Sequence, residues 1–201
     1  MKVAIHQPEH FPYMGFFQKM EAADLFVILD DAKFQGKRHW QNRNLIKLKN
    51  GSDFWLTVPI AKNTYDLKIN EVSLAPDYGW KRKLLKNIKY NLGLDLSKIY
   101  EYEKLIDVNM MSIEYCREKL NIETDMIYSS DLPVSGKKSE LLYNICKHVG
   151  AKTYLSGLGA KDYMDLDVFE DIEVEFFEPQ LKNNYSTIYN LRVNGEMSKN
   201  S

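Results

Sequence analysis

The sequence predicts an α/β fold of three layers, a mostly parallel sheet with helices on both faces, together with an antiparallel β-hairpin insertion. Two observations predict the sheet. Apolar runs of strand length recur along the chain, as in strands covered on both faces. Segments with apolar residues at helical spacing follow these runs, which is the rhythm of strand–helix–strand units. The turn dipeptide Asn50-Gly51 between two strand-like segments predicts the hairpin.

The first part of the sheet lies at the N-terminus. A strand over residues 3–6 leads into a loop that Pro8 and Pro12 keep from becoming helical. A helix is expected over residues 13–22. The continuous apolar run over residues 25–29 is the next strand.

The middle of the chain changes character. Residues 35–76 are interpreted as a β-rich insertion and residues 77–120 as a helical segment, because a hairpin turn gives way to apolar residues at helical spacing. The expected elements are a hairpin of residues 44–49 and 54–60, a candidate third strand over residues 67–74, and helices over residues 78–90 and 105–120.

The α/β rhythm then returns. Strands are expected over residues 125–129, 153–156 and 173–177, with a helix over residues 138–149. We therefore predict a single α/β domain over residues 1–182. Residues 183–201 are weakly patterned and are expected to form a weakly structured tail.

Composition narrows the class of protein. Of the 201 residues, 44% are hydrophobic, enough for a real core. A net charge of −1 argues against general electrostatic binding of the chain to nucleic acid or to an anionic membrane. No signal peptide is expected, because only a short apolar strand follows Lys2, and no apolar run approaches the roughly 20 residues that span a bilayer. Cys116 and Cys146 lack metal-ligand spacing and are expected to be buried thiols, as in a cytoplasmic protein.

Four polar residues accompany the end of the first strand: His6, Gln7, Glu9 and His10. Two imidazoles and a carboxylate can bind a phosphate, transfer protons or hold a metal, and the proline-bent loop makes a metal the weakest interpretation. We interpret His6 and His10 as catalytic, and Gln7 and Glu9 as substrate-binding. An unperturbed imidazole would titrate near roughly pH 6.5. The simpler alternative is that His6 is buried and His10 exposed.

Asp30 and Asp31 end the second strand. Carboxylates at the end of a buried strand are costly unless they are solvated or paired. They can orient a sugar hydroxyl, hold Mg²⁺ or pair with an arginine. We interpret Asp30 as catalytic and Asp31 as substrate-binding, and we assign no metal ligand.

A basic and aromatic run follows over residues 37–43. Such a run suits a phosphate beside a ring or a sugar face. Trp40, Asn42 and Arg43 are therefore candidate substrate-binding residues. The alternative is a solvated flank of the hairpin.

A glycine-containing loop follows the strand that ends at Ser156. Its backbone amides can approach an anion, which makes Ser156, Gly157 and Tyr163 candidate substrate-binding residues. Parallel strands present their carboxyl ends on one edge, so this loop should converge with the first two. Residues 129–131 lie at another strand end, but a turn into the next helix explains them equally well.

These motifs together resemble the WbqC-like family, in order along most of the chain to about residue 180. The matching pieces are His6-Gln7-Pro8-Glu9-His10-Phe11-Pro12-Tyr13-Met14-Gly15-Phe16-Phe17-Gln18-Lys19, Asp24 with Asp30-Asp31 and Phe34, Trp40-Gln41-Asn42-Arg43-Asn44, Trp55 to Pro59, Ser129-Ser130, and Tyr154 to Gly157 leading to Tyr163.

The resemblance implies a bacterial protein of O-antigen or other surface-polysaccharide biosynthesis. It points to a cytosolic transferase that acts on a nucleotide-linked sugar or on its acyl or aminoacyl donor. The alternatives are a non-catalytic nucleotide-sugar or carbohydrate-binding protein and, third, a metal-dependent hydrolase. The expected partner is a small molecule, with no nucleic acid and no membrane span. The sequence identifies neither a cofactor nor an oligomeric state.

Overall fold

A computed structural model describes residues 1–36, 38–64 and 66–197. Its internal contacts divide the chain into two compact units. Unit 1 consists of Met1–Gln7, Gly15–Asp31 and Ile122–Gln180, and unit 2 of Pro8–Met14, Ala32–Asn121 and Leu181–Ser201. The expected insertion and helical segment lie in unit 2. Whether residues 1–182 fold as one domain stays a prediction.

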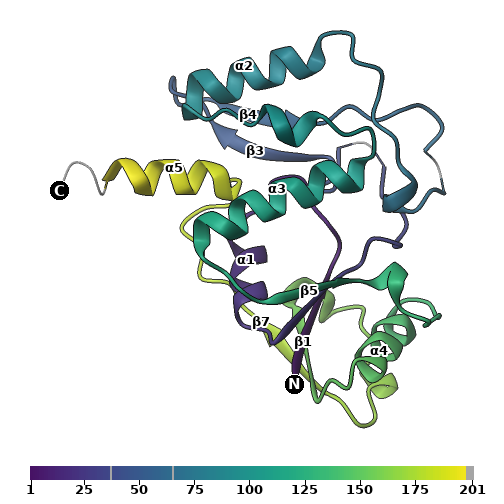
Figure 1. Ribbon diagram of the computed structural model, residues 1–201. Helices are drawn as coiled ribbons and strands as arrows, with labels where there is room; N and C mark the ends of the chain where they lie inside the picture. The colour runs from purple at the N-terminus through teal and green to yellow at the C-terminus, as the bar shows by residue number, and fades with distance from the viewer. Residues whose placement is uncertain (37, 65, 198–201) are drawn as a thin grey trace. The chain divides into compact units, whose positions relative to one another are not determined.

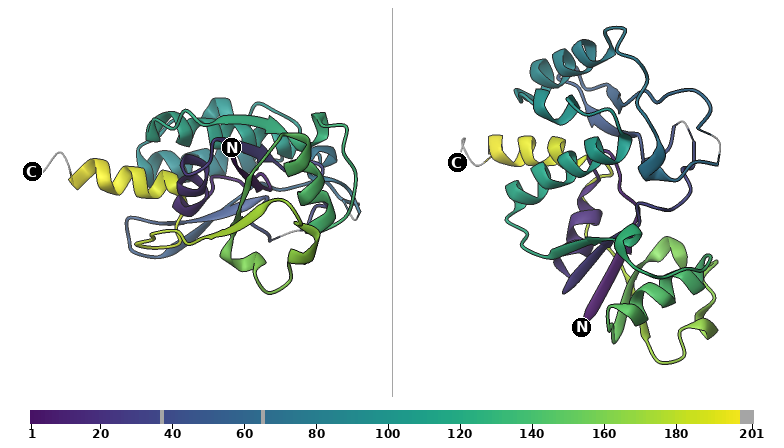
Figure 2. Two further views of the ribbon diagram at one scale, coloured as in Figure 1. Left: turned by 90° about the horizontal axis from the view of Figure 1, so that it is seen from below. Right: turned by 45° about the vertical axis from the view of Figure 1, so that its right-hand side comes forward.

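Unit 1 contains a five-stranded sheet in which every neighbouring pair is parallel. The strand order is β5-β2-β1-β6-β7. From β1 the chain builds outward through β2 and β5, then returns to the other side of β1 for β6 and β7, so the topological switch point lies between β1 and β6. The course of β1 beside β2 can be followed in Figure 2. The strands are β1 (Lys2–His6), β2 (Leu25–Ile28), β5 (Asp125–Tyr128), β6 (Thr153–Gly157) and β7 (Glu173–Phe177).

The alternation of side chains along β1 separates the layers of unit 1. Val3 and Ile5 belong to the core cluster that includes Ile145 of helix α4. On the other face, Phe16 of helix α1 packs against Phe26 of β2, with ring centroids 5.0 Å apart. Helices therefore cover both faces, which confirms the predicted fold class (Figure 1). The helices of unit 1 are α1 (Met14–Glu21), α4 (Ser139–His148), η3 (Ser129–Asp131), η4 (Leu158–Ala160) and η5 (Leu166–Val168).

Unit 2 contains the separate antiparallel hairpin, with Gly51 at φ +85° in its turn. The polar–apolar alternation over residues 67–74 does not produce a third strand. That segment contains a short 3₁₀ helix and only isolated bridges, one of which joins Ile60 to Leu74. The elements of unit 2 are β3 (Arg43–Lys47), β4 (Asp53–Thr57), η1 (Ile69–Glu71), α2 (Trp80–Leu92), η2 (Ser97–Tyr100), α3 (Leu105–Leu120) and α5 (Thr187–Met197).

The C-terminal segment differs from the expected weakly structured tail, because residues 187–197 form α5. Tertiary contacts explain the helix: Ile188 is fully buried, and the Ser186 amide donates to the Leu45 carbonyl at 2.8 Å. Residues 198–201 lie outside the described residues.

Two further expectations concern cysteines and membranes. Cys116 and Cys146 are buried and free, and burial raises the pKa of Cys146 to about 12. Among the described residues, none of the helices combines the length and apolar character needed to cross a bilayer.

Candidate functional site

Three strands of unit 1 end level with one another. His6 of β1 pairs with Ile28 of β2, and Ile28 pairs with Tyr128 of β5. The residues that follow these positions emerge at the carboxyl edge of the sheet, where open parallel sheets bind their ligands. The site is built on this edge.

Asp30 and Asp31, which follow β2, are held by two serines that follow β5. The Asp30 carboxylate accepts from the Ser129 hydroxyl at 3.1 Å, from the Ser130 amide at 3.1 Å and from the Ser130 hydroxyl at 2.7 Å. Ser129 Oγ also lies within hydrogen-bond distance of the Asp31 carboxylate, so its single proton is shared between the two acids. Asp30 is buried, so these donors offset the cost of removing its charge from water. Asp30 is thereby oriented by donors from the neighbouring strand end.

His6 is half-buried and has a defined tautomer. Its Nδ1 lies 2.9 Å from the Gln7 carbonyl. Because a carbonyl oxygen only accepts, Nδ1 carries the proton of the neutral ring, which leaves a lone pair on Nε2. Burial, and secondarily the charge of Lys19, lower the pKa of His6 to about 3. His6 is therefore a neutral imidazole with an unprotonated Nε2 at physiological pH.

Lys19 of α1 places a buried cation at the same strand end. Its ammonium donates to the Ile5 carbonyl at 3.1 Å, and its side chain is almost entirely buried. A buried ammonium near His6 keeps the imidazole neutral and can stabilise negative charge that develops beside it.

The edge of β6 lies on the other side of β1. Ala4 pairs with Leu155, so Gly157 is level with His6. Ser156 is buried and lies two residues after Tyr154, so the two side chains share a face of the sheet. Tyr154 belongs to the core cluster on the face opposite to His6. Tyr163 lies in the connection to β7 and is exposed. Gly157 thus joins the edge, whereas the side chain of Ser156 does not share a face with His6.

In unit 2, His10 is fully buried, so the simpler alternative of an exposed His10 is wrong. Its amide donates to the Trp40 carbonyl at 3.1 Å, and its Nε2 lies 3.2 Å from the Tyr100 hydroxyl. Burial lowers the pKa of His10 to about 3. Glu9 is nearly buried, and its charge adds to burial in raising the pKa of Tyr13. A catalytic role for His10 stays a prediction, and its contacts favour positioning.

Asn42 is also buried and ties segments of unit 2 together. Its side-chain amide donates to the Val58 carbonyl at 3.0 Å, and Asn109 of α3 donates to the carbonyls of Gln41 and Pro8 at 2.8 and 3.3 Å. The Oδ1 atoms of Asn42 and Asn109 are buried without a hydrogen-bond partner within the described part of the chain. Asn109 therefore joins the loop that carries His10 to Gln41, and Asn42 joins the adjoining turn to the residue after β4.

Trp40 and Arg43 meet a residue that the sequence did not single out as part of the site. The Trp40 and Trp55 rings lie 5.6 Å apart, and the Arg43 guanidinium carbon lies 3.9 Å from the Trp55 centroid. Both tryptophans are about two-fifths exposed, at 42% and 38%. Arg43 Nε is buried and has no partner within the described residues. We name Trp40, Trp55 and Arg43 the aromatic platform; a stacked Arg and two indoles suit a sugar or a ring.

Sequence reasoning missed Ser129, Ser130, Lys19 and Trp55. The serines carried a signal, because they follow a strand, but a helix-entry turn explained them equally well. Lys19 carried none, since a lysine on a short helix is usually solvated. In the part of the chain that the structure describes, no three His, Cys, Asp or Glu side chains gather as a metal site.

The fold and this polar edge define an α/β protein with a candidate ligand site at the end of a parallel sheet. The chain belongs to the WbqC-like protein family, which it matches over residues 7–194. It is 30% identical over 186 residues to the uncharacterized protein Rv1507c of Mycobacterium tuberculosis, covering 86% of this chain and 79% of that protein. No solved structure gives a significant match.

Proposed function

We propose that the protein is a cytosolic transferase that acts on a nucleotide-linked sugar, or on its acyl or aminoacyl donor, in bacterial surface-polysaccharide biosynthesis. The observation that carries this proposal is the geometry of His6: a neutral imidazole with a free Nε2 beside a buried cation, at the carboxyl edge of the sheet. Membership of the WbqC-like family supplies the expectation of the pathway.

The residues of unit 1 suit one division of labour. His6 Nε2 takes the proton from an acceptor hydroxyl or amine as its oxygen or nitrogen bonds to the donor carbon. The bond from that carbon to the leaving group breaks, and His6 returns the proton to the departing group. Asp30 and Asp31 orient sugar hydroxyls, and Lys19 offsets the negative charge that develops.

The test is a product screen by mass spectrometry. The purified protein is incubated with UDP-, GDP- and dTDP-linked hexoses and aminohexoses, each with and without acetyl-coenzyme A or a mixture of amino acids and ATP. A new mass should form with the wild type and with the His148→Gln control, whose histidine is exposed, and not with His6→Gln. Equal product from His6→Gln would refute the assigned base.

A non-catalytic nucleotide-sugar or carbohydrate-binding protein is the second candidate, and the exposed aromatic platform favours it. Calorimetry with the same nucleotide sugars separates the two. Saturable binding without any product in the screen would select the binding protein and reject the transferase.

A further inference from the structure

Charge is distributed unevenly between the two units. The segments of unit 2 contain 20 Lys and Arg against 12 Asp and Glu, whereas those of unit 1 contain 7 against 16. The net charge of −1 is therefore the sum of a surplus of 8 positive charges in unit 2 and a surplus of 9 negative charges in unit 1. Unit 2 can therefore attract an anionic partner even though the whole chain is nearly neutral.

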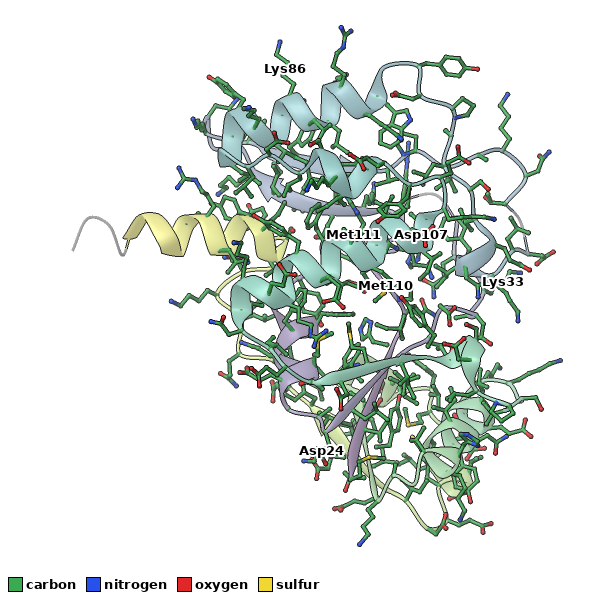
Figure 3. All side chains as sticks on the ribbon, in the orientation of Figure 1. Asp24, Lys33, Lys86, Asp107, Met110 and Met111 are labelled. Carbon is green, nitrogen blue, oxygen red and sulfur yellow. The ribbon has the colours of Figure 1, made fainter. Side chains whose placement is uncertain are left out.

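Helix α2 concentrates this positive charge. Leu84, Ile88 and Leu92 bury its apolar side, and no acidic residue occurs between Trp80 and Leu92. The exposed side carries cations at spacings of three and four residues, which places them on one stripe. The exposed cations of α2 are Arg82, Lys83, Lys86 and Lys89. Figure 3 shows Lys86 extending outward from the helix.

Residues beside α2 extend this stripe. Lys49, next to the hairpin turn, places its ammonium 5.1 Å from the Tyr90 ring, and its amide donates to Asn91 Oδ1 at 3.1 Å. Tyr78 and Tyr90 are 91% and 69% exposed. We name this surface the cationic face; it consists of Lys49, Tyr78, Arg82, Lys83, Lys86, Lys89 and Tyr90.

Two carboxylates flank the face, and one of them, Asp95, interacts electrostatically with Lys89. Asp77 and Asp95 flank α2 along the chain. Asp77 accepts from the amides of Gly79 and Lys81, and Asp95 accepts from the Ser97 amide. Among the described residues, the exposed cations of α2 have no carboxylate within ion-pair distance.

We propose that the cationic face docks the protein on the anionic phospholipid headgroups of a bilayer. Charge complementarity carries the proposal: a cluster of Lys and Arg on an amphipathic helix is attracted to an anionic leaflet. The apolar side of α2 is buried in its own unit, so the contact is peripheral. Exposed tyrosines suit the membrane interface. The cationic face contains more lysines than arginines. The lysine ammonium acts as a point charge, whereas the planar arginine guanidinium favours bidentate recognition of single phosphates in a nucleic acid.

The test is co-sedimentation of the full chain with vesicles of equal parts phosphatidylglycerol and phosphatidylcholine. The triple variant Lys83→Gln, Lys86→Gln, Lys89→Gln should lower the partition coefficient at least about tenfold. The matched control, Lys137→Gln, Lys138→Gln, Lys161→Gln in unit 1, removes the same number of exposed charges and should bind as the wild type does. Circular dichroism confirms that each variant is folded.

Binding of the wild type should weaken as salt rises and be absent from pure phosphatidylcholine. Failure of the wild type to sediment with anionic vesicles at low salt would overturn the proposal. Equal losses of vesicle binding in the two triple variants would also overturn it, because binding would then depend on total charge and not on the lysines of α2. Binding to random-sequence DNA without binding to vesicles would assign the face to nucleic acid instead.

Discussion

At the scale of residues, two histidines close together in the sequence occupy different surroundings. His6 lies half-buried at a strand end, with its Nδ1 proton directed to the Gln7 carbonyl. His10 is fully buried against Tyr100. Accessibility therefore favours His6 for proton transfer and His10 for holding the loop.

A flat pH profile is expected for the proposed reaction. The pKa of His6 is about 3, so the imidazole stays neutral from about pH 5 upward. The kcat/KM for product formation should change by less than about twofold between roughly pH 5.5 and 8. A limb near pH 6.5 in the wild type that disappears in His6→Gln would contradict the burial argument.

The stability of the chain should depend on His10 in acid. Its pKa is about 3 in the folded state and about 6.5 when unfolded, so its contribution is full above about pH 6.5 and is lost as the pH falls toward 3. In urea unfolding below pH 6.5, wild type should lose up to about 1.4 kcal/mol per pH unit more than His10→Gln. His148→Gln, at an exposed position, should parallel the wild type, and parallel slopes for all three would contradict the assignment.

At the scale of elements, the loop before α1 holds a strained residue. Phe11 has φ +44° although it precedes Pro12, a combination that a bulky residue rarely adopts. Its amide donates to Ser112 Oγ at 2.9 Å, and its carbonyl accepts from the Asn44 side chain at 2.8 Å. These partners keep the loop in this conformation.

Removing one of these partners should be costly. Ser112→Ala leaves the Phe11 amide unpaired in the interior, and the free energy of unfolding should fall by about 1–3 kcal/mol. Ser135→Ala, at an exposed position, should change it by less than about 0.5 kcal/mol. Denaturant unfolding measures both, and similar effects would show that Ser112 does not hold the loop.

The aromatic platform on the hairpin should contribute to ligand affinity. Arg43→Lys keeps the charge but loses the planar group over Trp55 and its two parallel donors. Affinity for the nucleotide sugar that the screen identifies should fall roughly tenfold in calorimetry, about 1.4 kcal/mol, with little change in Tm. Arg82→Lys on α2 is the control; equal affinities in all three proteins would make the platform part of the scaffold.

Local patterns predicted the regular elements, and tertiary contacts decided the rest. The helix over residues 105–120 matches α3 because its apolar spacing is a local property. The prediction of a strand over residues 67–74 was wrong because alternation of polar and apolar residues does not supply a pairing partner. Helix α5 was not predicted because the burial of Ile188 depends on distant residues. Strand-end reasoning placed His6, Asp30 and Asp31 at the carboxyl edge of the sheet, where the strand register puts them, and their roles stay predictions. The burial of His10 depends on residues far away in the sequence.

At the scale of the whole molecule, two units carry opposite charge. The near-neutral net charge of the whole chain argues against an anionic surface as a partner. A sum over the chain ignores how charges are grouped, so it does not exclude such a partner for unit 2. The fold gathers an acidic unit around the parallel sheet and a basic unit around α2 and the hairpin. Catalysis and docking are thereby proposed for different parts of one chain.

The comparison of His6→Gln with His10→Gln in the product assay tests the central claim, that chemistry occurs at the carboxyl edge of the unit 1 sheet. We expect His6→Gln to lower turnover by on the order of 100-fold with Tm nearly unchanged. His10→Gln should lower turnover only as far as it lowers the folded fraction. Full turnover in folded His6→Gln, with loss in folded His10→Gln, would contradict the account.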